Sequence, residues 1–336
     1  MTDRLAVDLY CGAGGVSLGL LQAGFRIGGA VDCDPVACAT YERNLGVRPV
    51  PARLEELDPR DFMAACGLSC GIDLLVGCPP CQGFSQAAGN AAGESDPRNR
   101  QVEVFARWVR VLKPRAVVFE NVPGILRRGG RYLTALLSAL EDSGMQYTAA
   151  ILNAADFGVP QRRKRLVVVA SRSGRPRLPE PSGMPPATVR GAIGDLPPLA
   201  AGESDPADPE HRARPLGERV LRLIRMIPRD GGSRTDLPRK YWMRCHLARR
   251  GHEDVLGRLR WDAPSPTITA GCTDVTKGRF VHPEQDRGLT PREAACLQSF
   301  PRWYRFEGNV RQVSAQIGNA FPPLLMERIA SLLARG

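Results

Sequence analysis

Two cysteines separated by two prolines are the first residues of this chain whose type and spacing could do chemistry. They are Cys78 and Cys81, in the stretch GCPPCQGFS that follows a short apolar run at 72–77. A pair at this spacing is typical of a zinc site, of a redox-active dithiol, or of one nucleophile with a second cysteine beside it. The choice among these three depends on the residues around the pair.

A zinc site needs four ligands, and Cys66 and Cys70 are the candidates for a second pair. The strand predicted at 72–77 would separate the two pairs inside a buried sheet, and no histidine is near them in the sequence. A redox pair is expected at the start of a helix, whereas a run of small residues follows at 82–96. A single nucleophile is favoured, because prolines fix the backbone and a loop of small residues can close over a substrate.

A glycine-rich turn between a predicted strand and a predicted helix is typical of a nucleotide-type site. The stretch VDLYCGAGGVS (7–17) has Asp8 in the strand, and Asp32 ends the next strand. Backbone can approach a ligand closely at such a turn, and an acidic residue after the second strand suits ribose hydroxyls. Ser17 stands where a dinucleotide fingerprint needs its third glycine. A nucleoside cofactor and a plain tight turn therefore both remain open.

Charged residues also lie at the ends of two further predicted strands, where burial is costly unless the charge is used. Glu120 ends the strand at 116–121, and its carboxyl group could give or accept a proton beside Cys81. The stretch QRRKR (161–165) alternates its glutamine and two of its arginines, which therefore project on the same side of the next strand. Taken alone, Glu120 could be a polar strand end with a structural role, and the QRRKR stretch could be a solvated basic patch.

Short apolar runs alternate with helical patterns in the first half of the chain. We expect strands at 5–10, 26–32, 72–77, 116–121 and 165–170, and helices from about 16 and at 35–45, 100–112 and 131–143. This alternation predicts an α/β fold with a mostly parallel sheet covered on both faces. Regular patterning stops at about Ser171 and returns at Leu289, where TPREAACLQSF and FPPLLMERIASLLA are expected to be helices.

Composition indicates a cytoplasmic protein with a polyanionic partner. The 336 residues carry a net charge of +11, and no apolar run approaches the roughly 18 residues of a membrane span. The ten cysteines are too dilute for a disulfide scaffold. Residues 172–283 hold 18 Arg and 2 Lys against 13 Asp and Glu, with 15 of the 29 prolines. Only four of the 46 basic residues are lysines, so GC-rich coding is an alternative source of this charge.

Six short stretches, in order along the chain, resemble the motifs of the bacterial DNA (cytosine-5) methyltransferase family: DLYCGAGG, PPCQGFS, ENV, QRRKR, LTPREAACLQSFP and QIGNAFPP. The resemblance implies a Rossmann-like methyltransferase fold that uses S-adenosyl-L-methionine. It implies a catalytic and cofactor-binding domain at 1–171, a small irregular target recognition domain at 172–283, and a return to the catalytic domain at 284–336.

The resemblance also implies a mechanism. Cys81 is the nucleophile that adds to C6 of a cytosine flipped out of duplex DNA, after which C5 accepts the methyl group. Glu120 holds N3 and the exocyclic amine, Arg163 holds O2 and steers the thiol, and Arg165 lies beside it. Cys78 is expected to be a packed neighbour. No metal is expected.

The remaining site residues are carried over by position in the motifs. Those expected to bind the cofactor are Asp8, Tyr10, Cys11, Gly12, Gly14, Gly15, Asp32, Cys33, Asp73, Pro79, Asn319 and Ala320. Those expected to bind the base or DNA are Pro80, Gln82, Ser85, Asn121, Gln161 and Thr267. The loop from about Gln82 to Arg100 is expected to close over the base.

Four positions depart from the family pattern. Tyr10 replaces a phenylalanine, Cys33 a tryptophan near adenine, and Gln101 an apolar residue. Arg53 stands where an aspartate often binds the adenine amine, so Glu55, Glu56 or backbone would have to serve.

Two other functions remain as alternatives. One is a cytosine-5 methyltransferase acting on transfer RNA, for which GCTDVT (271–276) is the nearest string to that type's Cys-Phe-Thr signature. The other is a catalytically inactive DNA-binding relative. We expect a monomer, away from membranes. Restriction protection, phage defence and stand-alone DNA modification all agree with the sequence.

Overall fold

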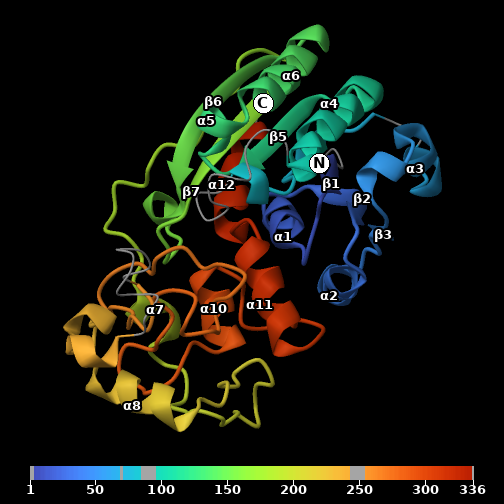
Figure 1. Ribbon diagram of the computed structural model, residues 1–336. Helices are drawn as coiled ribbons and strands as arrows, with labels where there is room; N and C mark the ends of the chain where they lie inside the picture. Colours follow the sequence, from blue (N-terminus) through green and yellow to red (C-terminus); the bar gives the residue numbers. More distant parts are fainter. Residues whose placement is uncertain (1–3, 69–70, 85–95, 243–253, 335–336) are drawn as a thin grey trace. The chain divides into compact units, whose positions relative to one another are not determined.

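The structure is a computed structural model that describes residues 4–68, 71–84, 96–242 and 254–334. It forms two compact units (Figure 1). Unit 1 contains Met1–Phe157, Lys164–Ser182 and Phe321–Gly336, and unit 2 contains Gly158–Arg163 and Gly183–Ala320. Within the described ranges, no helix has the length and apolar character needed to cross a membrane.

Unit 1 is built on a seven-stranded sheet with the order β3-β2-β1-β4-β5-β7-β6. Its strands are β1 (Leu5–Leu9), β2 (Arg26–Asp32), β3 (Val50–Pro51), β4 (Leu74–Gly77), β5 (Ala116–Asn121), β6 (Gln146–Asn153) and β7 (Lys164–Ser171). The first five in the spatial order pair in parallel, and β7 runs antiparallel to both β5 and β6. The expected mostly parallel α/β fold is confirmed.

Helices cover both faces of this sheet. They are α1 (Gly15–Gln22), α2 (Pro35–Leu45), α3 (Pro59–Ala65), α4 (Gln101–Leu112), α5 (Ile125–Arg128), α6 (Gly130–Asp142) and α12 (Pro323–Leu333). Helix α2 begins as expected with a proline in its first turn, after Asp34, whose side chain caps the helix. Helices α1 and α12 pack together closely at Gly19, where an added Cβ would meet the Pro323 carbonyl and the Met326 side chain.

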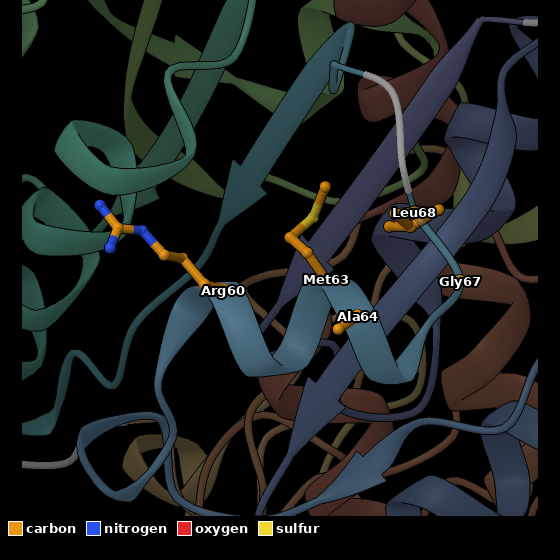
Figure 2. Close-up of a pocket in the computed structure, with 5 residues that line it drawn as sticks. All are labelled: Arg60, Met63, Ala64, Gly67 and Leu68. Carbon is orange, nitrogen blue, oxygen red and sulfur yellow. The ribbon is translucent and has the colours of Figure 1, made fainter.

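A shallow hollow lies on α3 and the turn that follows it. Its lining residues are Arg60, Met63, Ala64, Gly67 and Leu68 (Figure 2). The side chain of Leu68 lies beside Gly28 near the start of β2. The hollow is therefore at the amino-terminal edge of the parallel strands, away from the edge where open α/β sheets bind their ligands.

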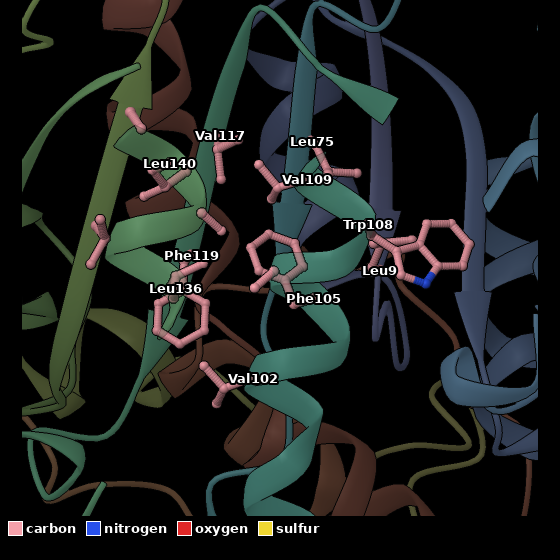
Figure 3. Close-up of a cluster of buried hydrophobic side chains, with 14 of the residues drawn as sticks. Leu9, Leu75, Val102, Phe105, Trp108, Val109, Val117, Phe119, Leu136 and Leu140 are labelled. Atoms are coloured by element: carbon pink, nitrogen blue, oxygen red, sulfur yellow. The ribbon is translucent and has the colours of Figure 1, made fainter. Parts of the chain in front are cut away.

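The main core lies between the sheet and helices α4 and α6. Val102, Phe105 and Val109 of α4 face the strands at helical spacing (Figure 3). They meet odd-numbered residues of the parallel strands, such as Val117 and Phe119, and even-numbered residues of β7, because side chains alternate along a strand. The rings of Phe105 and Phe119 lie 5.8 Å apart. The even-numbered residues of β5 therefore face the opposite side of the sheet.

Unit 2 contains short helices joined by long irregular segments. The helices are α7 (Val189–Ile193), α8 (Glu218–Met226), α10 (Pro291–Leu297) and α11 (Val310–Asn319). Residues 284–320 group with this unit, and only the last segment of the chain joins unit 1. The boundaries of the two compact units therefore differ from those of the functional domains expected from the sequence. The functional domains stay a prediction.

Buried arginines hold unit 2 together. Arg258 is 1% exposed. It donates to the carbonyls of Ile224 (3.0 Å), Ile227 (3.2 Å), His282 (3.2 Å) and Gln285 (2.9 Å), and it pairs with Asp286. Arg287 forms two hydrogen bonds with the Glu293 carboxylate at 2.7 and 2.8 Å, and Arg292 pairs with Asp208 at 2.5 Å. Guanidinium groups thus supply the donors that buried loop carbonyls need.

We predict that Arg258→Met destabilises the protein by about 3–5 kcal/mol, because four buried carbonyls and a carboxylate lose their donor. Arg222→Met, on the exposed face of α8, is the matched control and should change stability by less than about 0.5 kcal/mol. Urea denaturation followed by circular dichroism measures both. Equal stabilities of the two variants would contradict the structural role of Arg258.

Candidate active site

The carboxyl ends of the central strands bring four polar side chains to one side of the sheet. Asp8 pairs with Val76, and Val76 pairs with Val118. Val118 is an even-numbered residue of β5, so these three side chains face away from α4. Cys78, directly after β4, and Glu120, on β5, come two residues after Val76 and Val118 and therefore face the same side. Arg165 lies two residues before Val167, the partner of Glu120 on β7. The structure thus brings Glu120 and Arg165 together at the carboxyl edge of the sheet.

Glu120 and Arg165 form a close ion pair. The Arg165 Nε lies 2.7 Å from Glu120 Oε1, and each side chain is only 11% exposed. An ion pair this close restricts the carboxyl group, and the guanidinium offsets its charge in a poorly hydrated place. A carboxyl group held in this way is suited to hydrogen-bonding a substrate through its second oxygen.

Cys81 lies at the start of a short 3-10 turn, η2 (Gln82–Phe84), and is partly exposed. Its carbonyl accepts a hydrogen bond from the Phe84 amide at 3.0 Å. The fully buried Phe84 ring packs on Tyr132 with the ring centroids 6.0 Å apart. Gly124 allows this packing, because a Cβ there would lie 2.0 Å from the Phe84 carbonyl oxygen. Phe84 therefore anchors the segment that carries the thiol.

The prolines beside Cys81 are held by β5. Asn121, which is fully buried, donates from its Nδ2 to the Pro79 carbonyl at 3.3 Å, and its Oδ1 accepts from the Val122 amide at 2.9 Å. Asn121 thus supports the loop backbone, and its expected contact with the base or DNA stays a prediction. Pro80 lies between this support and the thiol.

Arg98 is a charged neighbour of Cys81 that the sequence analysis missed. It interacts electrostatically with the thiol, and it pairs with Asp96 at 2.6 Å. Both belong to the turn at η5 (Pro97–Arg100), where the buried Asn99 lies against Gly83. The signal in the sequence was the cluster DPRNR (96–100) directly after a run of small residues. Ser85 and most of the expected closing loop, together with the side chain of Gln82, lie outside the described residues.

The glycine-rich turn after β1 is tied to the end of β2. The Gly12 amide donates to Asp32 Oδ2 at 2.8 Å, and the Cys11 amide donates to the Val31 carbonyl at 3.0 Å. Gly14 has φ of 88° at the position that caps α1, a conformation that favours glycine, and Gly15 begins the helix. Most of the expected cofactor residues on β1 and β2 therefore form one connected turn.

Two departures from the family pattern contact each other. The Tyr10 hydroxyl lies 2.9 Å from the Gln101 carbonyl oxygen and 3.1 Å from its Oε1. A phenylalanine at position 10 would have no hydroxyl for this contact, and an apolar residue at position 101 would have no amide. The tyrosine and the glutamine are therefore complementary, and they join the turn after β1 to the first residue of α4.

Asp8 lies below this turn and is fully buried. Its Oδ2 accepts a hydrogen bond from the Ser17 hydroxyl at 2.7 Å, and Ser17 accepts from Tyr41 at 2.6 Å. Burial raises the pKa of Asp8 to about 7, against the effect of the Ser17 hydrogen bond. Ser17, which breaks the dinucleotide fingerprint, therefore has a partner in the strand below it.

The region expected to hold adenine is more open. Arg53 is 65% exposed at its side chain and lies 3.9 Å from Glu55 and 4.0 Å from Glu56, distances typical of loose ion pairs. Cys33 is exposed. Arg53 is thus turned toward two carboxylates of its own segment, and both remain candidates for the amine contact.

Asp73 lies at the opposite end of the strands from the glycine-rich turn, so its expected contact with the cofactor is not supported. Its Oδ2 accepts a hydrogen bond from the Leu5 amide at 2.8 Å, and its Oδ1 lies 3.2 Å from Arg115. Leu5 begins β1, so Asp73 is at the amino-terminal edge of the sheet, about 13 Å along the strand from the glycine-rich turn. It joins strands and is not placed to hold a ligand at the carboxyl edge.

Gln161 and Arg163 are engaged within unit 2. Gln161 is fully buried, donates to the Leu297 carbonyl and Gln298, and accepts from the Ile268 amide at 2.9 Å. Arg163, 2% exposed, donates to the carbonyls of Ile268 (2.9 Å) and Gly318 (3.1 Å). A DNA contact by Gln161 is therefore not supported, because its amide is used inside the unit. The expectation that Arg163 holds the base is weakened in the same way.

The other expected residues of unit 2 lie at its surface. The Thr267 hydroxyl donates to the Arg162 carbonyl at 2.8 Å. Asn319 ends α11 and is exposed, and Ala320 follows it. Their roles stay predictions. Among the residues that the structure describes, no group of three His, Cys, Asp or Glu side chains could hold a metal ion.

Comparison with known proteins decides which family has this arrangement. The profile of the C-5 cytosine-specific DNA methylases matches residues 5–335. The chain belongs to that family. It is therefore a DNA (cytosine-5) methyltransferase, an enzyme whose chemistry requires a methyl donor.

Individual relatives of this methyltransferase match over nearly its whole length. The type II methylase M.HgiDII of Herpetosiphon aurantiacus is 36% identical over 339 residues, which cover 98% of this chain and 94% of that protein. The type II methyltransferase M1.HphI of Haemophilus parahaemolyticus is 34% identical over 334 residues, which cover 98% and 86%. The solved structure of a prophage-encoded E. coli protein has a TM-score of 0.77 at 24% identity over 99% of both chains, which shows a shared fold.

We predict that Asp8→Asn makes this methyltransferase more stable at alkaline pH. The folded-state pKa of Asp8 is raised from 3.8 to about 7, so stability is lost as pH rises between these values and the loss is complete above the folded pKa. Asparagine does not ionise and still accepts from Ser17. The variant should therefore gain on the order of 2 kcal/mol relative to wild type between pH 5 and pH 8.

Urea denaturation at the two pH values measures this gain. Asp58→Asn, at the exposed cap of α3, is the control and should show no comparable gain. A constant difference between Asp8→Asn and wild type over this range would show that Asp8 is ionised throughout.

Proposed function

We propose that this enzyme transfers the methyl group of S-adenosyl-L-methionine to C5 of cytosine within a specific sequence of duplex DNA, through a covalent bond between Cys81 and C6. The observation that carries the proposal is the joint placement of the anchored Cys81 loop and the Glu120–Arg165 ion pair at the ends of β4 and β5. When bound, S-adenosyl-L-methionine supplies an electrophilic methyl group, and S-adenosyl-L-homocysteine is the product.

The turn after β1 suits this donor. Asp32 lies at the end of β2 with its carboxylate already oriented by the Gly12 amide, where ribose hydroxyls can bind it. Gly14 and Gly15 leave backbone accessible at the start of α1. Tyr10, Cys11 and Cys33 complete the turn, with Pro79 at the end of β4. Asn319 and Ala320 stay proposed as cofactor-binding residues.

Cys81 acts as the nucleophile. An ordinary thiol has a pKa near 8.5, so a nearby cation raises its reactive thiolate fraction. Arg98 is a charged group that interacts with Cys81 electrostatically. The thiolate would form a bond to C6 while N3 takes up a proton from Glu120. C5 would then bond to the methyl carbon as the bond from that carbon to the sulfonium sulfur breaks and S-adenosyl-L-homocysteine leaves. Loss of the C5 proton to a base would let the C6–S bond break and return the thiolate, and N3 would return its proton to Glu120.

Glu120 and Arg165 hold the base during addition. Protonated Glu120 donates to N3 and accepts from the exocyclic amine, which offsets the charge that develops on the ring. We assign the O2 contact to Arg165, because Arg165 lies against Glu120 whereas Arg163 donates to two backbone carbonyls of unit 2. These atoms of cytosine are out of reach in a stacked duplex, so the base must leave the helix.

Exposed arginines of unit 2 are proposed to bind the DNA phosphates. Arg258 is used inside the unit, and Arg190 pairs with Asp262 at 2.8 Å. Arg219 and Arg222 of α8 are exposed, and neither has a hydrogen bond or ion pair with another described residue. They lie three positions apart on one face of the helix, which suits contacts to successive phosphates.

The relatives named as type II methyltransferases favour a role beside a restriction enzyme. M.HgiDII and M1.HphI carry that description. We propose that this enzyme protects host DNA at the sites that a partner endonuclease would cut. The sequence it recognises is set by the side chains of unit 2 that reach base edges.

The proposal is tested by transfer of radiolabelled methyl from S-adenosyl-L-methionine to unmethylated plasmid DNA, with the label mapped at base resolution. We expect C5-methylcytosine within one short sequence, and Cys81→Ala should reduce the rate by roughly 10⁴-fold or more while DNA binding remains. Label on transfer RNA would establish the first alternative. Absence of label with DNA binding retained would establish the inactive relative.

We predict that the double variant Arg219→Gln/Arg222→Gln weakens binding uniformly across DNA sequences. Loss of two phosphate contacts should reduce the slope of log K against log salt by about 1.8. The control is Arg190→Gln/Arg302→Gln, which also removes two half-exposed charges of unit 2, each paired with an aspartate. Fluorescence anisotropy with a labelled duplex at several salt concentrations measures the slope. Equal slopes for the two double variants would exclude α8 as the phosphate-binding element.

A further inference from the structure

Cys78 has a defined place beside Glu120. It directly follows β4, and its amide donates to the Leu9 carbonyl at 3.4 Å, so it continues the parallel pairing of β4 with β1. Gly77 pairs with Phe119 on the other side. The next residues, Cys78 and Glu120, are therefore lateral neighbours whose side chains point to the same face. The Cys78 side chain is partly exposed, and its thiol interacts electrostatically with the Glu120 carboxylate beside it.

Glu120 is therefore held from both sides. Strand β5 lies between β4 and β7 in the sheet, so the thiol approaches from one neighbouring strand and Arg165 from the other. The two contacts differ in kind: the guanidinium is a charged donor, whereas a thiol is a weak and neutral one. Together they restrict the rotation of the carboxyl group.

We propose that Cys78 is a positioning residue for methyl transfer, and that its thiol donates a hydrogen bond that orients the Glu120 carboxyl group toward the cytosine ring. This inference rests on the proposed role of Glu120. It gives Cys78 a function other than packing, and it explains why the cysteine pair around two prolines contains one nucleophile and one donor.

The chemistry of the site favours a thiol that stays protonated. Burial, the nearby carboxylates of Glu120 and Asp8, and the hydrogen bond to Glu120 hold the pKa of Cys78 well above its usual range. Cys78 therefore remains a donor at neutral pH and does not compete with Cys81 for the base. A second cation in place of the thiol would bind the carboxylate more tightly and oppose its protonation, which contact with N3 requires.

The test compares three substitutions of Cys78 in the full-length enzyme. Cys78→Ala and Cys78→Val remove the donor, and valine also fills the space. Cys78→Ser keeps a hydroxyl donor. We expect both apolar variants to lower kcat for methyl transfer to plasmid DNA by about tenfold, with KM for DNA within twofold of wild type. Serine should restore kcat to within about threefold.

Two further readouts separate positioning from packing. The pH profile of kcat should shift for the alanine and valine variants and return for serine, because only the donor acts on Glu120. In a Glu120→Gln background, Cys78→Val should cause little further loss, since the partner has changed. Thermal unfolding identifies a variant that folds poorly, and the valine variant then replaces the alanine variant.

Three results would overturn the proposal: wild-type kcat and pH profile in the valine variant, equal impairment of serine and valine, or additive losses of Cys78→Val and Glu120→Gln. A failed proposed function is distinguishable from these, because wild type would then be inactive on DNA or Cys81→Ala would remain active.

Discussion

The buried carboxyl group of Glu120 requires a cation at the carboxyl end of β5. A further parallel strand would bring another carboxyl end to this edge of the sheet. An antiparallel strand brings its first residues instead, and this is what β7 does with Arg165, two residues from the partner of Glu120. The antiparallel direction of β7 therefore places a guanidinium group beside the buried carboxyl group of Glu120.

The same edge shows how short-range rules place a whole site. Alternation along β4 and β5 sends Phe119 into the core under α4 and sends Cys78 and Glu120 to the other face. The Phe84 anchor then fixes where Cys81 lies after the prolines. The described part of the site is assembled from the last two residues of β5 and the first turn after β4.

Much of unit 1 could be predicted from the sequence, because buried strands and capped helices have strong local signals. Strand β6 was not predicted, since QYTAAILN lies at the sheet edge, is half exposed and carries little alternation. Helix α8 was missed although Val220, Leu223, Ile224 and Ile227 have helical spacing, because the arginines and prolines around it dominate the composition. Asp73 was carried over by its position in the family motifs, although its place near the start of the strand predicted at 72–77 already puts it at the amino-terminal edge. The net positive charge of unit 2 overstated its DNA-binding surface. Arg258 and Arg279, which were among the arginines expected to contact DNA, donate hydrogen bonds to backbone carbonyls of the unit.

The contact between Tyr10 and Gln101 ties the turn after β1 to the first residue of α4. The two residues are 91 positions apart, and the Tyr10 hydroxyl donates to the backbone carbonyl and the side-chain oxygen of Gln101. An apolar residue at position 101 would still offer its backbone carbonyl to the hydroxyl, whereas phenylalanine at position 10 would remove the donor. The two replacements are therefore unequal, and the tyrosine is the member of the pair on which the contact depends.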